Sequence, residues 1–109
     1  MTTMYRVIFE HHVALNNEAI FIKKWKSSSD IIQKEPGALG SKLFKSPAKS
    51  KSDEVVLYIM ADWTSKRART TSIAAIKARG ITIENHNELA IRTNMTEYEL
   101  VEESLPIVK

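Results

Sequence analysis

The chain contains three histidines, two tryptophans and no cysteine, which limits its candidate chemistry to imidazole, aromatic, hydroxyl and charged side chains. His11 is the best candidate for a general base, because an imidazole titrates near neutral pH and the alternate residues around it are apolar. The alternative is a histidine that is simply hydrogen-bonded at the end of a strand. His12 would point to the opposite face, where we expect a structural or exposed side chain. His86 lies in a stretch without clear periodicity, and we expect it at the surface.

Aromatic and basic residues could complete a binding site around such a base. Trp63 could wall a cavity and donate its indole N–H, or it could anchor the helix that follows it. Phe9 shares its strand face with the base, and Trp25 lies on a helix stripe, where a core position is the stronger interpretation. Tyr58 could donate a proton to a substrate oxygen, or it could belong to an interface between subunits. Arg67 could bind an anionic oxygen or remain solvated.

Several kinds of site are excluded by what the sequence lacks. Without cysteine there are no disulfides, thiolate zinc sites or thiol nucleophiles. The sequence has no dinucleotide-binding glycine pattern, no P-loop, no H-E-x-x-H and no nucleophile elbow. Adjacent histidines on a strand diverge, so His11 and His12 alone cannot share a metal. We therefore expect neither a cofactor nor a metal.

The length of 109 residues and the apolar fraction of 43% fit one domain, residues 1–109. No apolar run is long enough to span a membrane, and residues 1–12 lack the pattern of a signal peptide, so we expect a cytoplasmic protein without membrane contact. Part of the net charge of +3 comes from one lysine-rich loop, residues 42–51. We expect this loop to be solvated, with phosphate or nucleic-acid contact as the alternative.

The hydrophobic pattern predicts seven elements in order. Residues 4–13 alternate as a strand, and an amphipathic helix follows from a cap at Asn16 or Asn17 to residue 34, where Pro36 ends it. Residues 38–46 and 55–63 form two strands joined by a long loop. Thr64 caps a second helix that ends before Gly80. Residues 85–92 could form a short helix, and the last strand is predicted at residues 96–105, followed by a tail at 105–109.

This order is the split βαβ pattern of a ferredoxin-like α+β sandwich with an antiparallel sheet. The strand at residues 55–63 is apolar on both faces, so helices can cover only one of them. An exposed face of that kind would be an oversized apolar patch. We therefore predict a homodimer that packs sheet against sheet.

Two segments, EPGALGSKLF and YIMADWTSKRA, resemble the antibiotic biosynthesis monooxygenase family. The resemblance covers residues 4–104 and implies a dimeric α/β-barrel built from ferredoxin-like subunits. Its motif has a glutamate before Pro-Gly and a short strand, then a strand that ends in tryptophan before a serine-containing cap. The matching positions are Glu35, Pro36, Gly37, Leu39, Gly40, Trp63 and Ser65.

Family members that need no cofactor oxidise electron-rich phenols or quinols, which themselves reduce dioxygen after losing a proton. The protein then supplies a dry cavity, a base and an aromatic wall. The resemblance thus implies a cofactor-independent monooxygenase for a small aromatic or quinol ligand, with His11 and Trp63 as catalytic candidates. Substrate contacts would come from Phe9, Trp25, Tyr58 and Arg67. The alternative is a non-catalytic dimer of the same fold that binds or senses a small molecule.

Two further activities fit the sequence poorly. Haem degraders of the family carry a histidine ligand in the helix after the tryptophan, and here that helix, SKRARTTSIAAIKAR, has none. A relocated ligand such as His11 or His86 would be needed. RNA-recognition motifs share the topology, but the run DEVVLYIMADW lacks their glycine and basic residues, so we expect no nucleic-acid partner.

Overall fold

Four antiparallel strands form the sheet of the computed structural model, which describes residues 3–81 and 86–107. The strands lie in the order β2-β3-β1-β4, so β1 is paired on both sides. Their bounds are Tyr5–Ala14 for β1, Ala38–Lys45 for β2, Glu54–Trp63 for β3 and Ala90–Glu99 for β4. The predicted ferredoxin-like α+β fold is confirmed.

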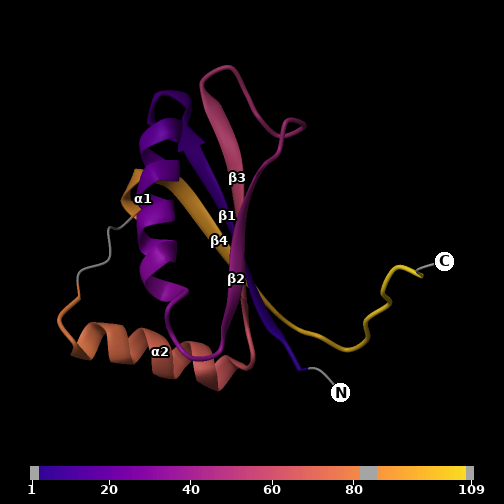
Figure 1. The fold of residues 1–109 in the computed structure, drawn as a ribbon. Coiled ribbons are helices and arrows are strands. Elements are labelled where there is room, and N and C mark those ends of the chain that lie inside the picture. Colours follow the sequence, from indigo (N-terminus) through magenta and orange to yellow (C-terminus); the bar gives the residue numbers. More distant parts are fainter. Residues whose placement is uncertain (1–2, 82–85, 108–109) are drawn as a thin grey trace.

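Both helices, α1 (Glu18–Ile32) and α2 (Lys66–Ala78), lie on the same side of the sheet, and the segment after β4 leaves on the other side (Figure 1). The alternation of β1 explains the layering, because Tyr5, Val7 and Val13 point toward the helices and are buried. The buried side chains form two clusters: Leu57 and Ile59 of β3 pack with Val13 and with Phe21 of α1, and Trp63 packs with Tyr5 and Val7.

The turn between α1 and β2 depends on two glycines with positive φ. Gly37 has φ of 85°, and a side chain there would come within 2.8 Å of Ala68 and Thr64. Gly40 has φ of 106° at an irregularity in the pairing of β2 with β3. Its amide N–H donates to Gln33 Oε1 over 2.8 Å, which ties β2 to the end of α1. The Pro-Gly turn thus fixes how α1, β2 and α2 meet.

The caps differ from the prediction in two places. Ser65, and not Thr64, caps α2, because its Oγ accepts from the amide N–H of Ala68 at 3.0 Å. Asn17 occupies the N-cap of α1 without a side-chain hydrogen bond, since a 3₁₀ turn, η1 (Leu15–Asn17), leads directly into that helix. Gly80 ends α2 with φ of 71°, as predicted.

The last third of the chain also differs from the structure predicted from the sequence. The final strand begins at Ala90 and ends at Glu99, six residues earlier than predicted. The short helix is a 3₁₀ turn, η2 (His86–Leu89), and residue 85 of the predicted helix lies outside the described residues. Residues 101–107 follow without regular structure and are exposed, and residues 108–109 of the predicted tail are not described. β4 was hard to predict because nearly all of its side chains are exposed, so its sequence is polar and weakly patterned.

The outward face of the sheet carries both apolar and charged side chains. Phe44 and Tyr98 are about half exposed there, at 48% and 49%. Arg6 forms a two-point ion pair with Asp62, through Nε at 2.7 Å and Nη2 at 2.9 Å. No helix among the described residues is long and apolar enough to cross a membrane.

Candidate functional site

A partly enclosed cavity of about 130 Å³ lies between the sheet and the two helices. We call it the central cavity. It separates the core around Phe21 and Leu57 from a second cluster around Trp63. Small side chains leave the space open between these bulky groups, namely Ser28, Ser29, Ser41 and Ala61. A cavity of this size holds one aromatic ring.

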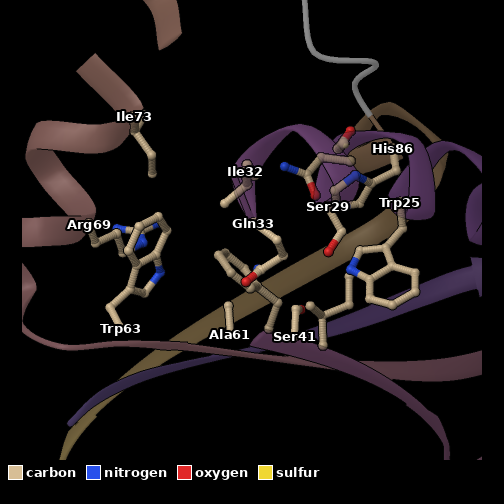
Figure 2. Close-up of a pocket in the computed structure, with 14 residues that line it drawn as sticks. Trp25, Ser29, Ile32, Gln33, Ser41, Ala61, Trp63, Arg69, Ile73 and His86 are labelled. Carbon is tan, nitrogen blue, oxygen red and sulfur yellow. The ribbon is translucent and has the colours of Figure 1, made fainter. Parts of the chain in front are cut away.

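The sheet and α1 supply most of the wall. Phe9, Ile59 and Trp63 come from the strands, where alternation points them toward the helices. In Figure 2, Trp63 stands at one end of the central cavity and Trp25, from α1, at the other. Ser28 Oγ donates to the Lys24 carbonyl over 3.1 Å, so this serine hydroxyl is turned back onto its own helix.

Arg69 is the single charged side chain among the described residues that line the central cavity. It comes from the first turns of α2 and lies at the Trp63 end (Figure 2). Arg67, the residue predicted for this role, is exposed and lines a separate open groove beside Pro36. The helix turns by about 100° per residue, so two positions carry a side chain to nearly the opposite side. Arg69 therefore takes the place expected of Arg67.

Two imidazoles meet near the Trp25 end of the cavity. His86 lines the central cavity, and its ring centroid lies 5.6 Å from that of His11, with an angle of 78° between the planes. His11 is fully buried, and its Nδ1 lies 2.9 Å from Thr93 Oγ1. Both rings also contact Phe21, each at 5.1 Å. His11 Nε2 and His86 Nδ1 are buried without a hydrogen-bond partner among the described residues.

Burial controls the charge of this pair. Burial, with a smaller contribution from the nearby His86, lowers the pKa of His11 to about 4. Burial also lowers the pKa of His86 from its ordinary value. Both rings are therefore neutral at pH 7, when each can accept a proton.

The predicted site residues divide into two groups. Phe9, Trp25 and Trp63 line the central cavity together, and Trp63 is also a buried core residue at 2% exposure. His11 lies behind them, against Phe9 at a ring distance of 5.8 Å, and does not itself line the cavity. Tyr58 does not reach it at all.

Tyr58 lies on the outward face of the sheet, in a polar network centred on Glu10. Its hydroxyl donates to Glu10 Oε1 over 2.7 Å, and Lys49 lies 3.3 Å from the same oxygen. His12 Nε2 lies 3.0 Å from Glu10 Oε2 and its Nδ1 lies 3.2 Å from Glu54, so this histidine is structural, as expected. These contacts lower the pKa of Glu10 to about 2, with the His12 hydrogen bond as the largest cause. Lys49 thus has a carboxylate partner within its own chain.

Arg69 and His86 line the cavity, although neither was predicted there from the sequence. His86 was hard to place because residues 81–94 have no clear period, and four of them lie outside the described part. The serine run at 27–29 was a usable signal, because small polar residues on the inward stripe of a helix leave space beneath it. Among the described residues, no group of three or more metal-binding side chains is present.

Comparison with known proteins supports the fold. No family model and no curated protein sequence matches the chain. Solved structures do match, including a conserved protein from Methanosarcina mazei with a TM-score of 0.71 and 16% identity, covering 89% of this chain and 92% of that one. A Bacillus cereus protein, provisionally named an antibiotic biosynthesis monooxygenase, has a TM-score of 0.70 and 14% identity, covering 94% and 98%.

The cofactor-independent oxygenase SnoaB from Streptomyces nogalater is a further match. Its TM-score is 0.66 at 13% identity, and the alignment covers 98% of this chain and 100% of SnoaB. The resemblance to the antibiotic biosynthesis monooxygenases, expected from the two sequence segments, is therefore confirmed at the level of the fold.

Proposed function

We propose that this protein is a cofactor-independent monooxygenase that oxidises a small, electron-rich phenol or quinol in the central cavity. The observation that carries the proposal is the cavity itself: it is ring-sized, mostly apolar, walled by two indoles, and polar at both ends. Such a site excludes bulk water from a substrate that must react with dioxygen. The fold shared with SnoaB supports the same reaction class.

The reaction balances without a cofactor. A phenol gives its hydroxyl proton to a base, and the phenolate then passes electrons to dioxygen and forms a carbon–oxygen bond at the ring carbon opposite the hydroxyl. The resulting peroxide takes up a proton. The O–O bond then breaks with loss of the ring C–H proton, which leaves a quinone and one water. One dioxygen is consumed for each phenol.

The polar groups at the two ends of the cavity match the two negative charges that form in turn, first on the phenolate oxygen and then on the peroxide. His86 and Arg69 lie at opposite ends in Figure 2, on either side of the space that a ring would occupy. A phenol oriented with its hydroxyl toward the neutral imidazole would form its peroxide near the guanidinium, which stabilises negative charge. We infer that oxygen enters opposite the hydroxyl.

We further propose that the protein acts as a homodimer joined through the outward faces of the sheets. The half-exposed Phe44 and Tyr98, with Ile8 paired to Met60 between them, support this surface. The ion pairs on the same face would give the interface its register.

Oxygen consumption tests the enzymatic proposal. Purified protein is mixed with single-ring methoxyphenols that carry hydrogen at the carbon opposite the hydroxyl while dioxygen is recorded, and the product is analysed after labelling with heavy-isotope dioxygen. We expect one labelled oxygen in a para-quinone and the other in water. Both tryptophans of the chain line the cavity, so their fluorescence reports binding independently. Tight binding without oxygen uptake would contradict the enzyme and favour the non-catalytic binding dimer.

A further inference from the structure

An unusual feature of the cavity is the pair of imidazoles at one end of it, with His86 in the wall and His11 behind it. Buried polar nitrogens normally have a partner, and an unpaired one is unfavourable. Here two such nitrogens, His11 Nε2 and His86 Nδ1, belong to rings in contact. Neither nitrogen is held in a hydrogen bond among the described residues, so protonation of the pair would break no bond at these two atoms.

We propose that the His11–His86 pair is the proton acceptor of the central cavity, with His86 as the catalytic base and His11 as the residue that positions it. The inference rests on the proposed occupation of the cavity by a hydroxyl-bearing aromatic. His86 is the histidine that lines the cavity, so it is the one that can meet the substrate hydroxyl. His11 packs against His86 and is held by Thr93.

The surroundings of the pair decide how it behaves. The aromatic and hydrogen-bonding partners of the His11 ring are Phe9, Phe21, His86 and Thr93, none of which carries a fixed charge. The charged group that lines the same cavity is Arg69, at the far end. Glu88, in the same 3₁₀ turn as His86, is exposed. Inside the cavity, a phenolate formed in the same transfer supplies a counter-charge to the proton on His86.

Thr93 gives His11 a fixed orientation. Its hydroxyl can donate to His11 Nδ1 or accept from it, so it holds the ring in one orientation with either tautomer. A fixed His11 ring holds the edge-to-face contact with His86, and so keeps the base at the cavity wall. A positive charge on one ring disfavours a charge on the other, so the pair takes up a single proton.

The test uses a nitrophenol, whose phenolate is coloured and whose ring is too electron-poor to reduce dioxygen. Binding is followed by tryptophan fluorescence, and ionisation of the bound ligand by its visible absorbance. We expect bound nitrophenol to remain a phenolate at a pH where free nitrophenol is protonated, while the NMR signals of His86 move to their imidazolium positions. In His86→Gln the bound ligand should be the neutral phenol.

The neighbouring histidine provides the matched control. His12→Gln changes the same residue type on the opposite face and should leave the absorbance of the bound ligand unchanged. Thr93→Val should give an intermediate phenolate fraction, and Thr93→Ser should restore it, which a purely structural role would not produce. Equal phenolate fractions in the wild type and His86→Gln, or no ionisation of nitrophenol in the wild type, would overturn the inference.

Failure of this inference differs from failure of the proposed oxidation. Oxygen uptake that persists in His86→Gln would show that the His11–His86 pair is not the proton acceptor, and the proposed monooxygenase activity would stand. Ionisation of nitrophenol by His86 without any oxygen uptake would support the His11–His86 pair as proton acceptor and would contradict the proposed monooxygenase activity.

Discussion

Single side chains of modest size create the site. Ser28 and Ser29 lie on the inward stripe of α1, and Ser41 and Ala61 lie opposite them on β2 and β3, where larger apolar residues would close the core. Two tryptophans stand at the ends of the space that results. The cavity therefore exists because four positions carry small side chains, and its chemistry depends on the few polar groups that line it.

Arg69 and Arg67 offer a direct comparison at this scale. Arg69→Gln should weaken the binding of 4-hydroxybenzoate about tenfold, because its carboxylate, opposite the hydroxyl that faces His86, loses a hydrogen bond from a charged donor inside a partly buried site. Arg67→Gln should leave the affinity unchanged, since that side chain is exposed outside the cavity. Titration by tryptophan fluorescence measures both. Equal losses in the two variants would show that long-range charge, and not contact, governs affinity.

The buried His11 makes stability depend on pH. Its pKa is about 4 in the folded protein and near 6.5 in the unfolded chain, so the unfolded state binds more protons between these values. The free energy of unfolding should be highest above pH 6.5 and fall by up to about 3 kcal/mol as the pH drops to 4.

Denaturant unfolding at a series of pH values, followed by fluorescence, measures this slope. His11→Phe should make it shallower, with His86 supplying the remainder because its pKa is lowered as well. An unchanged slope in His11→Phe would mean that His11 is protonated without cost in the folded protein.

At the scale of elements, the Pro-Gly turn and the start of α2 position Trp63 and Arg69 together. Thr64 N–H donates to the Gly37 carbonyl over 2.8 Å, and Ser72 Oγ donates to the Pro36 carbonyl over 3.1 Å. These bonds join the Pro-Gly turn to the residue before the α2 cap and to the middle of α2. The orientation of α2, and with it Arg69, thus depends on the turn.

The cap of α2 can be tested with adjacent residues. Ser65→Ala should lower the free energy of unfolding by about 1 kcal/mol, because the Ala68 amide loses its acceptor. Thr64→Ala should cost less, since Thr64 is exposed and does not cap the helix. Chemical denaturation compares the two. A larger loss for Thr64→Ala would identify Thr64 as the true cap.

Sequence patterns predicted β1, β2, β3 and α2 closely because each has strong alternation or clear end signals, such as the Gly80 stop. β4 was misplaced because an exposed edge strand, with residues such as Arg92 and Asn94, has no buried face to impose a pattern. Phe9, Trp25 and Trp63 meet at the cavity because aromatics on inward faces converge there, whereas the sequence favoured a core position for Trp25 and left Trp63 open between a cavity wall and a helix anchor. Arg69 was missed because one end of a helix presents two arginines, and only the helix orientation distinguishes them.

At the scale of the whole molecule, both faces of the sheet matter. The helix-covered face holds the central cavity, and the outward face combines exposed aromatics with the network around Glu10. Val56 on that outward face is 1% exposed even in a single subunit, because its neighbours crowd over it. The proposed dimer would bury the rest of this face.

A charge placed on the outward face tests the dimer. Tyr58→Asp should give monomer or unfolded protein, and Phe44→Asp should give folded monomer, because Phe44 is 48% exposed and on an edge strand. Tyr58→Phe should preserve the dimer. Analytical ultracentrifugation measures the state of each. A stable dimer in both aspartate variants, or a monomeric wild type, would place the interface elsewhere or remove it.

The central claim is that oxidation occurs inside the cavity between helices and sheet. Ala61→Phe fills that space from β3, and Ala74→Phe adds the same ring to the exposed side of α2 as a control. Oxygen uptake with a single-ring methoxyphenol, measured for the wild type and both variants at equal folded concentration, tests it most directly. We predict uptake by the wild type and Ala74→Phe and none above buffer by Ala61→Phe; equal uptake by all three would contradict the account.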